Sequence, residues 1–274
     1  MDESRMNHEK LVEKSKQIRN KILDMVFKAK SGHITSAFSI VEILVTLYYR
    51  IMVTCPQCPD NNLRDRFIMS KGHGCVAQYV ILADLGYFPE EELEKFAEPG
   101  GILGSHPDMC KIPGIEASTG SLGHGLSIAA GMALASKIDK KDYKVFCLLG
   151  DGECQEGSVW EAAMFAAHSK LNNLIAIVDN NRLQAGGTIE ETTSLYPLSS
   201  KWAAFHWNVR QVDGHDLDAI YLCLCDCLKD SEAPTVIIAH TVKGKGVSFM
   251  ENNRAWHTMI PSEEEYRKAR EELA

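Results

Sequence analysis

Two polar segments follow two apolar runs at a spacing that could build a metal site. Asp151, within Gly150-Asp151-Gly152, follows the apolar run 145–149, and Asn181 follows the apolar run 174–178. Thirty positions separate the two residues, enough for one helix and its connections between parallel strands. Because parallel strands bring their carboxyl ends to one edge of a sheet, we expect both side chains there. A carboxylate and an amide oxygen suit Mg²⁺, which takes its remaining ligands from phosphate and water. The spacing therefore predicts a site for Mg²⁺ and a diphosphate, whereas Gly-Asp-Gly alone would predict only a turn.

The elements that must position these residues alternate along the chain. Short apolar runs predict strands at 67–69, 145–149, 174–179, 208–212 and 235–239. Helical periodicity predicts helices at 7–29, 39–50, 75–85, 123–135, 158–169, 217–229 and 262–272. The prolines and glycines of 51–65 and 98–122 predict irregular segments, and a loop as long as 98–122 is usually functional. The alternation predicts an α/β fold with a parallel sheet covered by helices on both faces.

Composition narrows the class of protein. The chain has 274 residues, 45% of them apolar, which favours one large domain over two small ones. A net charge of −8 argues against a general role in binding nucleic acid. The sequence contains no run of 18 or more apolar residues, so it predicts no membrane span. The charged segment Met1–Arg5 lacks the apolar core of a signal peptide. We therefore expect a cytoplasmic protein.

The nine cysteines raise the question of a zinc site or disulfides. Cys55 and Cys58 form one Cys-x-x-Cys pair, but a structural zinc site needs four ligands, so we expect a turn with two thiols. Cys223 and Cys227 share one face of a predicted helix and should act as small packing residues. An odd cysteine count without a signal peptide favours reduced thiols.

The metal motif is also where the chain resembles a known family. Gly150-Asp151-Gly152 through Asn181 is similar to the thiamine diphosphate (ThDP) motif of ThDP-dependent enzymes, and more of the chain resembles transketolase. The further matching segments, in the family's order, are Ser31-Gly32-His33, Ser70-Lys71-Gly72-His73, Ser105-His106-Pro107, Thr119-Gly120-Ser121-Leu122-Gly123-His124-Gly125, and Thr241-Val242-Lys243-Gly244-Lys245-Gly246 followed by Trp256-His257. The resemblance runs from about residue 10 to the end.

The resemblance implies a fold, a cofactor and a metal. The fold is that of the ThDP diphosphate-binding domain, called the PP domain, and the cofactors are ThDP and Mg²⁺, with Ca²⁺ or Mn²⁺ as substitutes. The implied metal ligands are Asp151, Asn181 and the backbone carbonyl of Leu183. The implied cofactor-binding residues are His73, Gly120, Leu122, Gly150, Gly152, Glu156, Asn181, Lys243 and His257. Glu156 resembles a glutamate at the contact between subunits, although an exposed acid in the first turn of a helix would look the same.

The resemblance also implies the activity. Transketolases transfer a two-carbon ketol unit from a ketose to an aldose, and this requires taking a proton from a hydroxyl and later returning one. The implied catalytic residues are four histidines, whose side chains can do both near neutral pH: His33, His73, His106 and His257. The resemblance assigns proton movements to His33 and His257, the first hydroxyl of the two-carbon unit to His106, and the diphosphate and nearby substrate oxygens to His73.

The match covers only the first half of a transketolase. Residues 1–274 would be a single PP domain, and the pyrimidine-binding domain, with the glutamate that activates ThDP, would lie on a partner chain. We therefore expect the N-terminal subunit of a split transketolase, active only with its C-terminal subunit in an α2β2 assembly. Ser121, where the family often has proline, is similar to such two-chain members; Ile34-Thr35-Ser36-Ala37 departs from the family pattern.

Two alternatives remain open at the sequence level. The chain could be a subunit of another two-chain ThDP enzyme, such as a 2-oxo acid dehydrogenase α subunit or a deoxyxylulose phosphate synthase half. It could also be a ThDP-binding module without catalytic activity. The four histidines favour transketolase, with sugar phosphates or related anionic ketoses and aldoses as substrates; the sequence does not identify the sugars.

Overall fold

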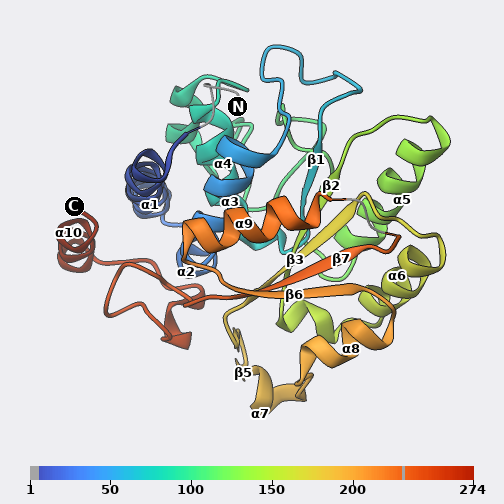
Figure 1. Ribbon diagram of the computed structural model, residues 1–274. Helices are drawn as coiled ribbons and strands as arrows, with labels where there is room; N and C mark the ends of the chain where they lie inside the picture. Colours follow the sequence, from blue (N-terminus) through green and yellow to red (C-terminus); the bar gives the residue numbers. More distant parts are fainter. Residues whose placement is uncertain (1–5, 230–231) are drawn as a thin grey trace.

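A parallel sheet forms the centre of the molecule (Figure 1). The computed structural model describes residues 6–229 and 232–274, so the segment Met1–Arg5 lies outside it. The strand order is β1-β2-β3-β7-β6, and every neighbouring pair is parallel. The strands are β1 (Arg66–Met69), β2 (Val145–Gly150), β3 (Leu174–Asn180), β6 (Asn208–Asp213) and β7 (Thr235–His240). The five predicted strands are confirmed.

Helices cover both faces of this sheet, as predicted (Figure 1). Side chains of β2 alternate between two cores, with Phe146 and Leu148 in one and Cys147 and Leu149 in the other. The first core is shared with α1 (His8–Ala29), α2 (Ile34–Phe38), α3 (Val41–Thr46), α4 (Cys75–Asp84) and α9 (Leu217–Cys227). The second core is shared with α5 (Gly125–Ile138), α6 (Gly157–His168) and α8 (Leu198–Ala204). The last helix, α10 (Glu263–Glu272), packs on α1, where Tyr266 stacks on Phe27.

The helix predicted over 39–50 is wrong in its bounds. The chain forms α2 and α3 and then the π-helical turn η1 (Leu47–Ile51), closed by a hydrogen bond from Met52 N to Leu47 O (2.8 Å). Helix α2 starts at Ile34, directly after His33 and before the predicted start at residue 39. The break between α2 and α3 falls at the buried Ser39, which donates its hydroxyl to Asp179 of β3 (2.7 Å).

Smaller elements and one long loop complete the fold. The segment 98–122 contains no helix or strand, which confirms the predicted long loop. Elements that we did not predict are the 3-10 turns η2 (Gly72–Gly74), η3 (Glu90–Lys95), η4 (Gly152–Gln155) and η5 (Arg254–His257), the hairpin of β4 (Leu183–Gln184) with β5 (Gly187–Thr188), helix α7 (Ile189–Thr193) and helix α8.

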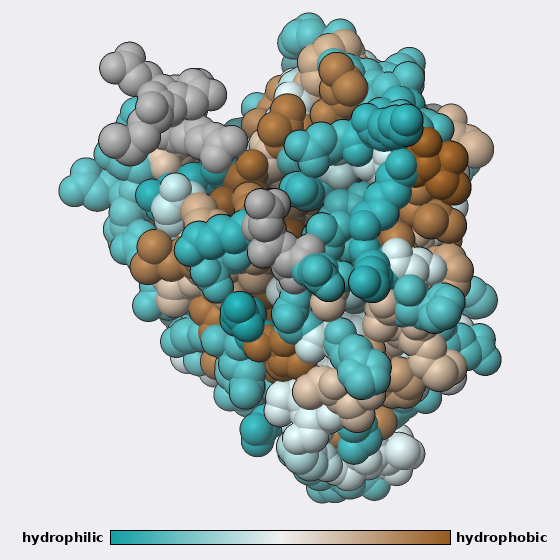
Figure 2. Space-filling model, turned by 45° about the vertical axis from the view of Figure 1, so that its right-hand side comes forward, coloured by the Kyte–Doolittle hydropathy of each residue, from teal (hydrophilic) through white to brown (hydrophobic). Residues whose placement is uncertain are grey.

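Among the described residues, no helix is both long and apolar enough to cross a membrane. On the face shown in Figure 2, apolar residues lie in several patches with polar residues between them. Most of the apolar side chains are instead buried in the two cores on either side of the sheet.

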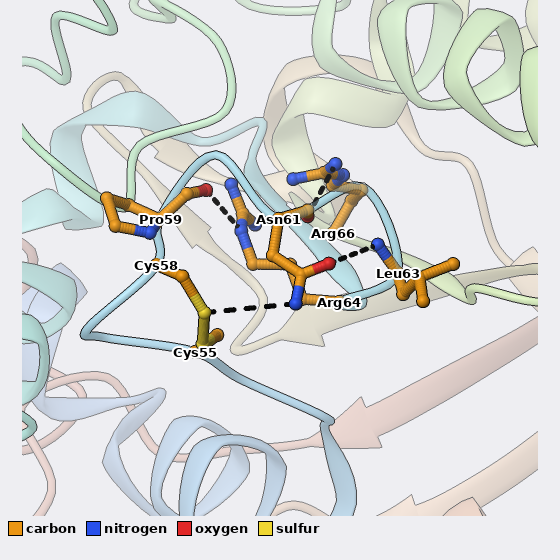
Figure 3. Close-up of a disulfide and its surroundings, with 7 residues drawn as sticks. All are labelled: Cys55, Cys58, Pro59, Asn61, Leu63, Arg64 and Arg66. Atoms are coloured by element: carbon orange, nitrogen blue, oxygen red, sulfur yellow. Dashed lines mark hydrogen bonds between the residues drawn. A yellow bond between two sulfur atoms is a disulfide. The ribbon is translucent and has the colours of Figure 1, made fainter.

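The expectation of reduced thiols is wrong for one pair. Cys55 and Cys58 form a disulfide in the segment that precedes β1 (Figure 3). The predicted turn is present, since Cys58 N donates to Cys55 O (3.1 Å), and it brings the two Cα atoms to 5.2 Å, within the range for a disulfide. The other seven cysteines are free, and both Cys223 and Cys227 pack against the core, as expected.

Candidate active site

The register of β2 against β3 brings the two predicted metal ligands together. Gly150 lies opposite Asp179, and the next amide along β2, Asp151 N, donates to Asp179 O (3.2 Å). The backbone N–H of Arg182, the residue after Asn181, donates to Asp151 Oδ2 (2.6 Å). The predicted juxtaposition of Asp151 and Asn181 at the carboxyl edge of the sheet is therefore present in the structure.

The oxygen atoms at this edge fit a divalent cation. Asn181 Oδ1 accepts from Leu183 N (3.1 Å), while Leu183 O accepts from Lys243 Nζ (3.2 Å). Burial, together with the neighbouring carboxylate of Asp179, raises the pKa of Asp151 to about 7. A buried carboxylate of this kind is stabilised by a cation, and an oxygen-only ligand set suits a hard cation such as Mg²⁺.

The predicted site residues line one cavity of about 400 Å³. The residues shared between the prediction and this cavity are His33, His73, His106, Gly120, Leu122, Gly150, Asp151, Gly152, Glu156, Asn181, Leu183, Lys243 and His257. They come from segments spread along the whole chain. The structure thus brings every predicted position into one place, while the individual roles stay predictions.

The four histidines form a cluster around His33. Its ring centroid lies 5.3 Å from that of His73, 5.4 Å from that of His257 and 6.2 Å from that of His106. His33 precedes α2, His73 lies in η2, His106 in the 98–122 loop and His257 in η5. The Nδ1 atoms of His33 and His257 are buried and have no hydrogen-bond partner in the described part of the chain. Buried ring nitrogens with unused hydrogen-bonding capacity are suited to a polar ligand.

Burial lowers the pKa values of three of the histidines: His33, His73 and His257. Burial, with the neighbouring Lys243 and His33, lowers the pKa of His257 to about 4. Burial is also the main reason that the pKa values of His33 and His73 are lowered. Burial and the nearby Lys71 ammonium lower the pKa of Lys243 to about 8. Near pH 7 the imidazoles of His33, His73 and His257 are therefore unprotonated at one ring nitrogen and can accept a proton.

Sequence reasoning missed three buried charged residues beside the cavity: Lys71, Glu153 and Asp179. The Glu153 carboxylate accepts hydrogen bonds from Ser70 Oγ, Gly123 N (2.9 Å) and Gly150 N (3.0 Å), and so it joins three loops of the site. Asp179 was visible as a carboxylate at the end of the predicted buried strand 174–179. A charge in such a strand is rarely left unpaired, and this was the signal that sequence reasoning could have used.

Two loops of the site approach each other so closely that side chains would clash. Thr119 Oγ1 donates to Met69 O (2.7 Å) at the end of β1. A Cβ atom on Gly125 would lie 2.3 Å from Ser70 Oγ, and one on Gly72 would lie 2.8 Å from Gly120 N. The glycines therefore let the loop that carries Gly120 and Leu122 lie directly on the loop that carries His73.

Comparisons with known proteins agree with this geometry. Residues 10–274 match the family model described as "Transketolase, thiamine diphosphate binding domain". An apulose-4-phosphate transketolase subunit from Phocaeicola vulgatus is 44% identical over 269 residues, covering 98% of this chain and 95% of that relative. The 6-deoxy-6-sulfo-D-fructose transketolase subunit SqwG of Clostridium sp. is 43% identical over 256 residues, covering 93% of each.

A solved structure shows the same fold. The transketolase of Campylobacter jejuni superposes with a TM-score of 0.93 at 33% identity, covering 98% of this chain. The present chain spans only 43% of that transketolase chain. The matched region thus corresponds to less than half of a full-length member.

The close approach at Gly125 leads to a first prediction. Gly125→Ala should lower the free energy of unfolding by about 1–3 kcal/mol, because the methyl group overlaps Ser70 and forces the two loops apart. Gly131→Ala is the matched control: it lies in the same helix with no atom near its Cβ position, so it should be neutral or stabilising. Urea denaturation of the two variants measures the difference, and equal stabilities would contradict the packing described here.

Proposed function

This chain belongs to the transketolase family, in which it matches the thiamine diphosphate-binding domain, and we propose that it is the N-terminal subunit of a two-chain transketolase. The observation that carries this proposal is the single cavity that unites four histidines with an Asp, Asn and carbonyl oxygen set. The relatives named as subunits cover more than nine-tenths of the chain and are themselves of similar length.

We assign the metal to the strand edge. Asp151, Asn181 and the carbonyl of Leu183 would hold Mg²⁺, or Ca²⁺ or Mn²⁺ in its place. Lys243 and His73 would face the diphosphate, and the backbone N–H of Gly152 can approach a phosphate oxygen because no Cβ stands in the way. When bound, ThDP supplies the electron sink for cleaving a carbon–carbon bond next to a carbonyl.

The histidines would supply proton transfer and orientation. His33 and His257 have lowered pKa values, so each can accept the proton of a substrate hydroxyl and later return it. His106, 6.2 Å from His33 between ring centroids, would bind the first hydroxyl of the two-carbon unit.

The proposal includes a partner. A second chain would carry the pyrimidine-binding domain and its glutamate, in an α2β2 assembly whose subunit contact includes Glu156. The chain itself would then be a single PP domain working in the cytoplasm. In support, the chain matches 43% of a full-length transketolase chain, and the related proteins of this length are named as subunits.

The substrate class follows from the names of the relatives together with the reaction. One relative is named for apulose 4-phosphate and another for 6-deoxy-6-sulfo-D-fructose, so a terminal phosphate and a sulfonate both occur among them. We propose an anionic ketose as donor and an aldose as acceptor, with the terminal anion bound mainly by the partner chain.

Binding of the cofactor gives a second prediction. The full chain should bind ThDP in a Mg²⁺-dependent manner by calorimetry, and Asp151→Ala should weaken that binding at least a hundredfold because a charged ligand to the metal is lost. Asp142→Ala removes a carboxylate whose side chain is 98% exposed and should change nothing. Undiminished binding by the Asp151 variant would remove the basis of the metal assignment.

Activity of the assembled enzyme gives a third prediction. The chain alone should show no ketol transfer, and addition of the C-terminal subunit should produce it.

Because the pKa values of His33, His73 and His257 are lowered, their neutral forms persist as pH falls, and the acid limb of kcat should lie below about pH 6.5.

Substitution of single histidines tests their proposed role in proton transfer. His257→Asn should reduce kcat by about 10²–10⁴, the usual range for a proton-transfer group. His168→Asn, at the exposed end of α6, is the matched control and should retain full activity.

Two outcomes would contradict the proposal. One is ketol transfer by the purified single chain, and the other is an acid limb of the kcat profile at or above about pH 6.5.

A further inference from the structure

A buried carboxylate next to the metal site has no role in the proposed function. Asp179 is fully buried at the end of β3, two residues before Asn181. Its Oδ2 accepts hydrogen bonds from Lys71 Nζ, Ser39 Oγ (2.7 Å) and Asn181 Nδ2 (2.8 Å). Its Oδ1 accepts from Thr241 Oγ1. Four side-chain donors from four different segments therefore converge on one carboxylate.

One of these donors decides the orientation of a metal ligand. The two ends of an asparagine amide have nearly the same shape, so packing alone does not determine which end faces a ligand. A carboxylate can only accept hydrogen bonds, so Asp179 selects the NH₂ end of Asn181. Asn181 Oδ1 is thereby left on the side of Leu183, whose N–H it accepts (3.1 Å).

The charge on Asp179 is held in place by a lysine. Lys71 is 1% exposed, and its ammonium group also donates to Ser36 O in α2 (3.1 Å). The Lys71 ammonium pairs directly with Asp179, which together with its other donors makes Asp179 an acceptor. Lys71 thereby joins the loop of His73 to the end of β3 and to the helix that follows His33.

We propose that Asp179, supported by Lys71, is a positioning residue that orients the Asn181 amide so that its oxygen faces the metal. This inference rests on the proposed function, since it concerns the same metal. It adds a residue that acts through Asn181 without touching the metal itself. An asparagine at position 179 could donate its own NH₂ group, and the Asn181 amide would then turn its oxygen inward and present nitrogen to the cation.

The experiment measures the affinity of the full chain for Mg²⁺ at saturating ThDP by calorimetry. Asp179→Asn should lower this affinity about 10- to 100-fold, the usual effect of losing a group that orients a metal ligand. Ser39→Ala is the matched control, because it removes another donor to the same carboxylate and leaves the contact with Asn181; its affinity should stay within about threefold of the unmutated chain. A folded Asp179→Asn chain with unchanged affinity would overturn the proposal.

A double variant separates orientation from general structural damage. In Asp179→Asn/Asn181→Asp the amide and the carboxylate exchange places, and a carboxylate at position 181 presents an oxygen in either orientation. Mg²⁺ affinity should return to within about tenfold of the unmutated chain. A folded double variant that binds Mg²⁺ no better than Asp179→Asn would contradict the orienting role.

A measurement on the unmutated chain covers the case in which the variants do not fold. The side-chain NH₂ protons of Asn181 should exchange slowly with D₂O in NMR spectra, before and after addition of Mg²⁺ and ThDP, because Asp179 holds them. Fast exchange would overturn the proposal. If instead the unmutated chain binds no Mg²⁺ with ThDP, the proposed function fails, while slow exchange still supports the pairing of Asp179 with Asn181.

Discussion

The parallel pairing of β2 with β3 is the constraint on which the site depends. With Gly150 opposite Asp179, the chain leaves both strands at the same level and turns Asp151 and Asn181 toward the same space. A shift of the register by one residue would send alternate side chains to the opposite face of the sheet. The apolar runs on either side fix the register, because their side chains fill two separate cores. The stability of the sheet and the geometry of the proposed metal site are thus determined by the same residues.

Around this edge, the structure balances several buried charges. Asp151, Glu153 and Asp179 are buried carboxylates, and Lys71 and Lys243 are buried ammonium groups nearby. Asp179 pairs with Lys71, and Glu153 is satisfied by backbone N–H groups and a hydroxyl. Asp151 accepts hydrogen bonds from the backbone N–H groups of Gly152 and Arg182 and has a raised pKa. It is thus the carboxylate for which a bound cation would provide the missing charge.

The sequence analysis predicted the five strands and the order of the motifs, and every site residue that it named lines the cavity. The strands could be predicted because buried parallel strands are near-continuous apolar runs, and the pairing of Asp151 with Asn181 because both residues follow such strands directly. The histidines and the remaining site positions were implied by the resemblance to transketolase. Sequence reasoning missed Lys71 and Asp179 because their pairing depends on contacts across 108 positions of sequence. Helix α7 had a local signal, a capping box of Thr188 and Glu191, that could have been used. The disulfide of Cys55 with Cys58 could not be decided from sequence, since the same spacing suits a free dithiol.

The most direct test of the account is a crystal structure of the chain grown with Mn²⁺ and ThDP. Anomalous scattering locates manganese without reference to the ligands. The account predicts one manganese ion bound by Asp151 Oδ, Asn181 Oδ1 and Leu183 O, with its other ligands from the diphosphate and water. A manganese ion elsewhere, or a diphosphate bound away from the ends of β2 and β3, would contradict it.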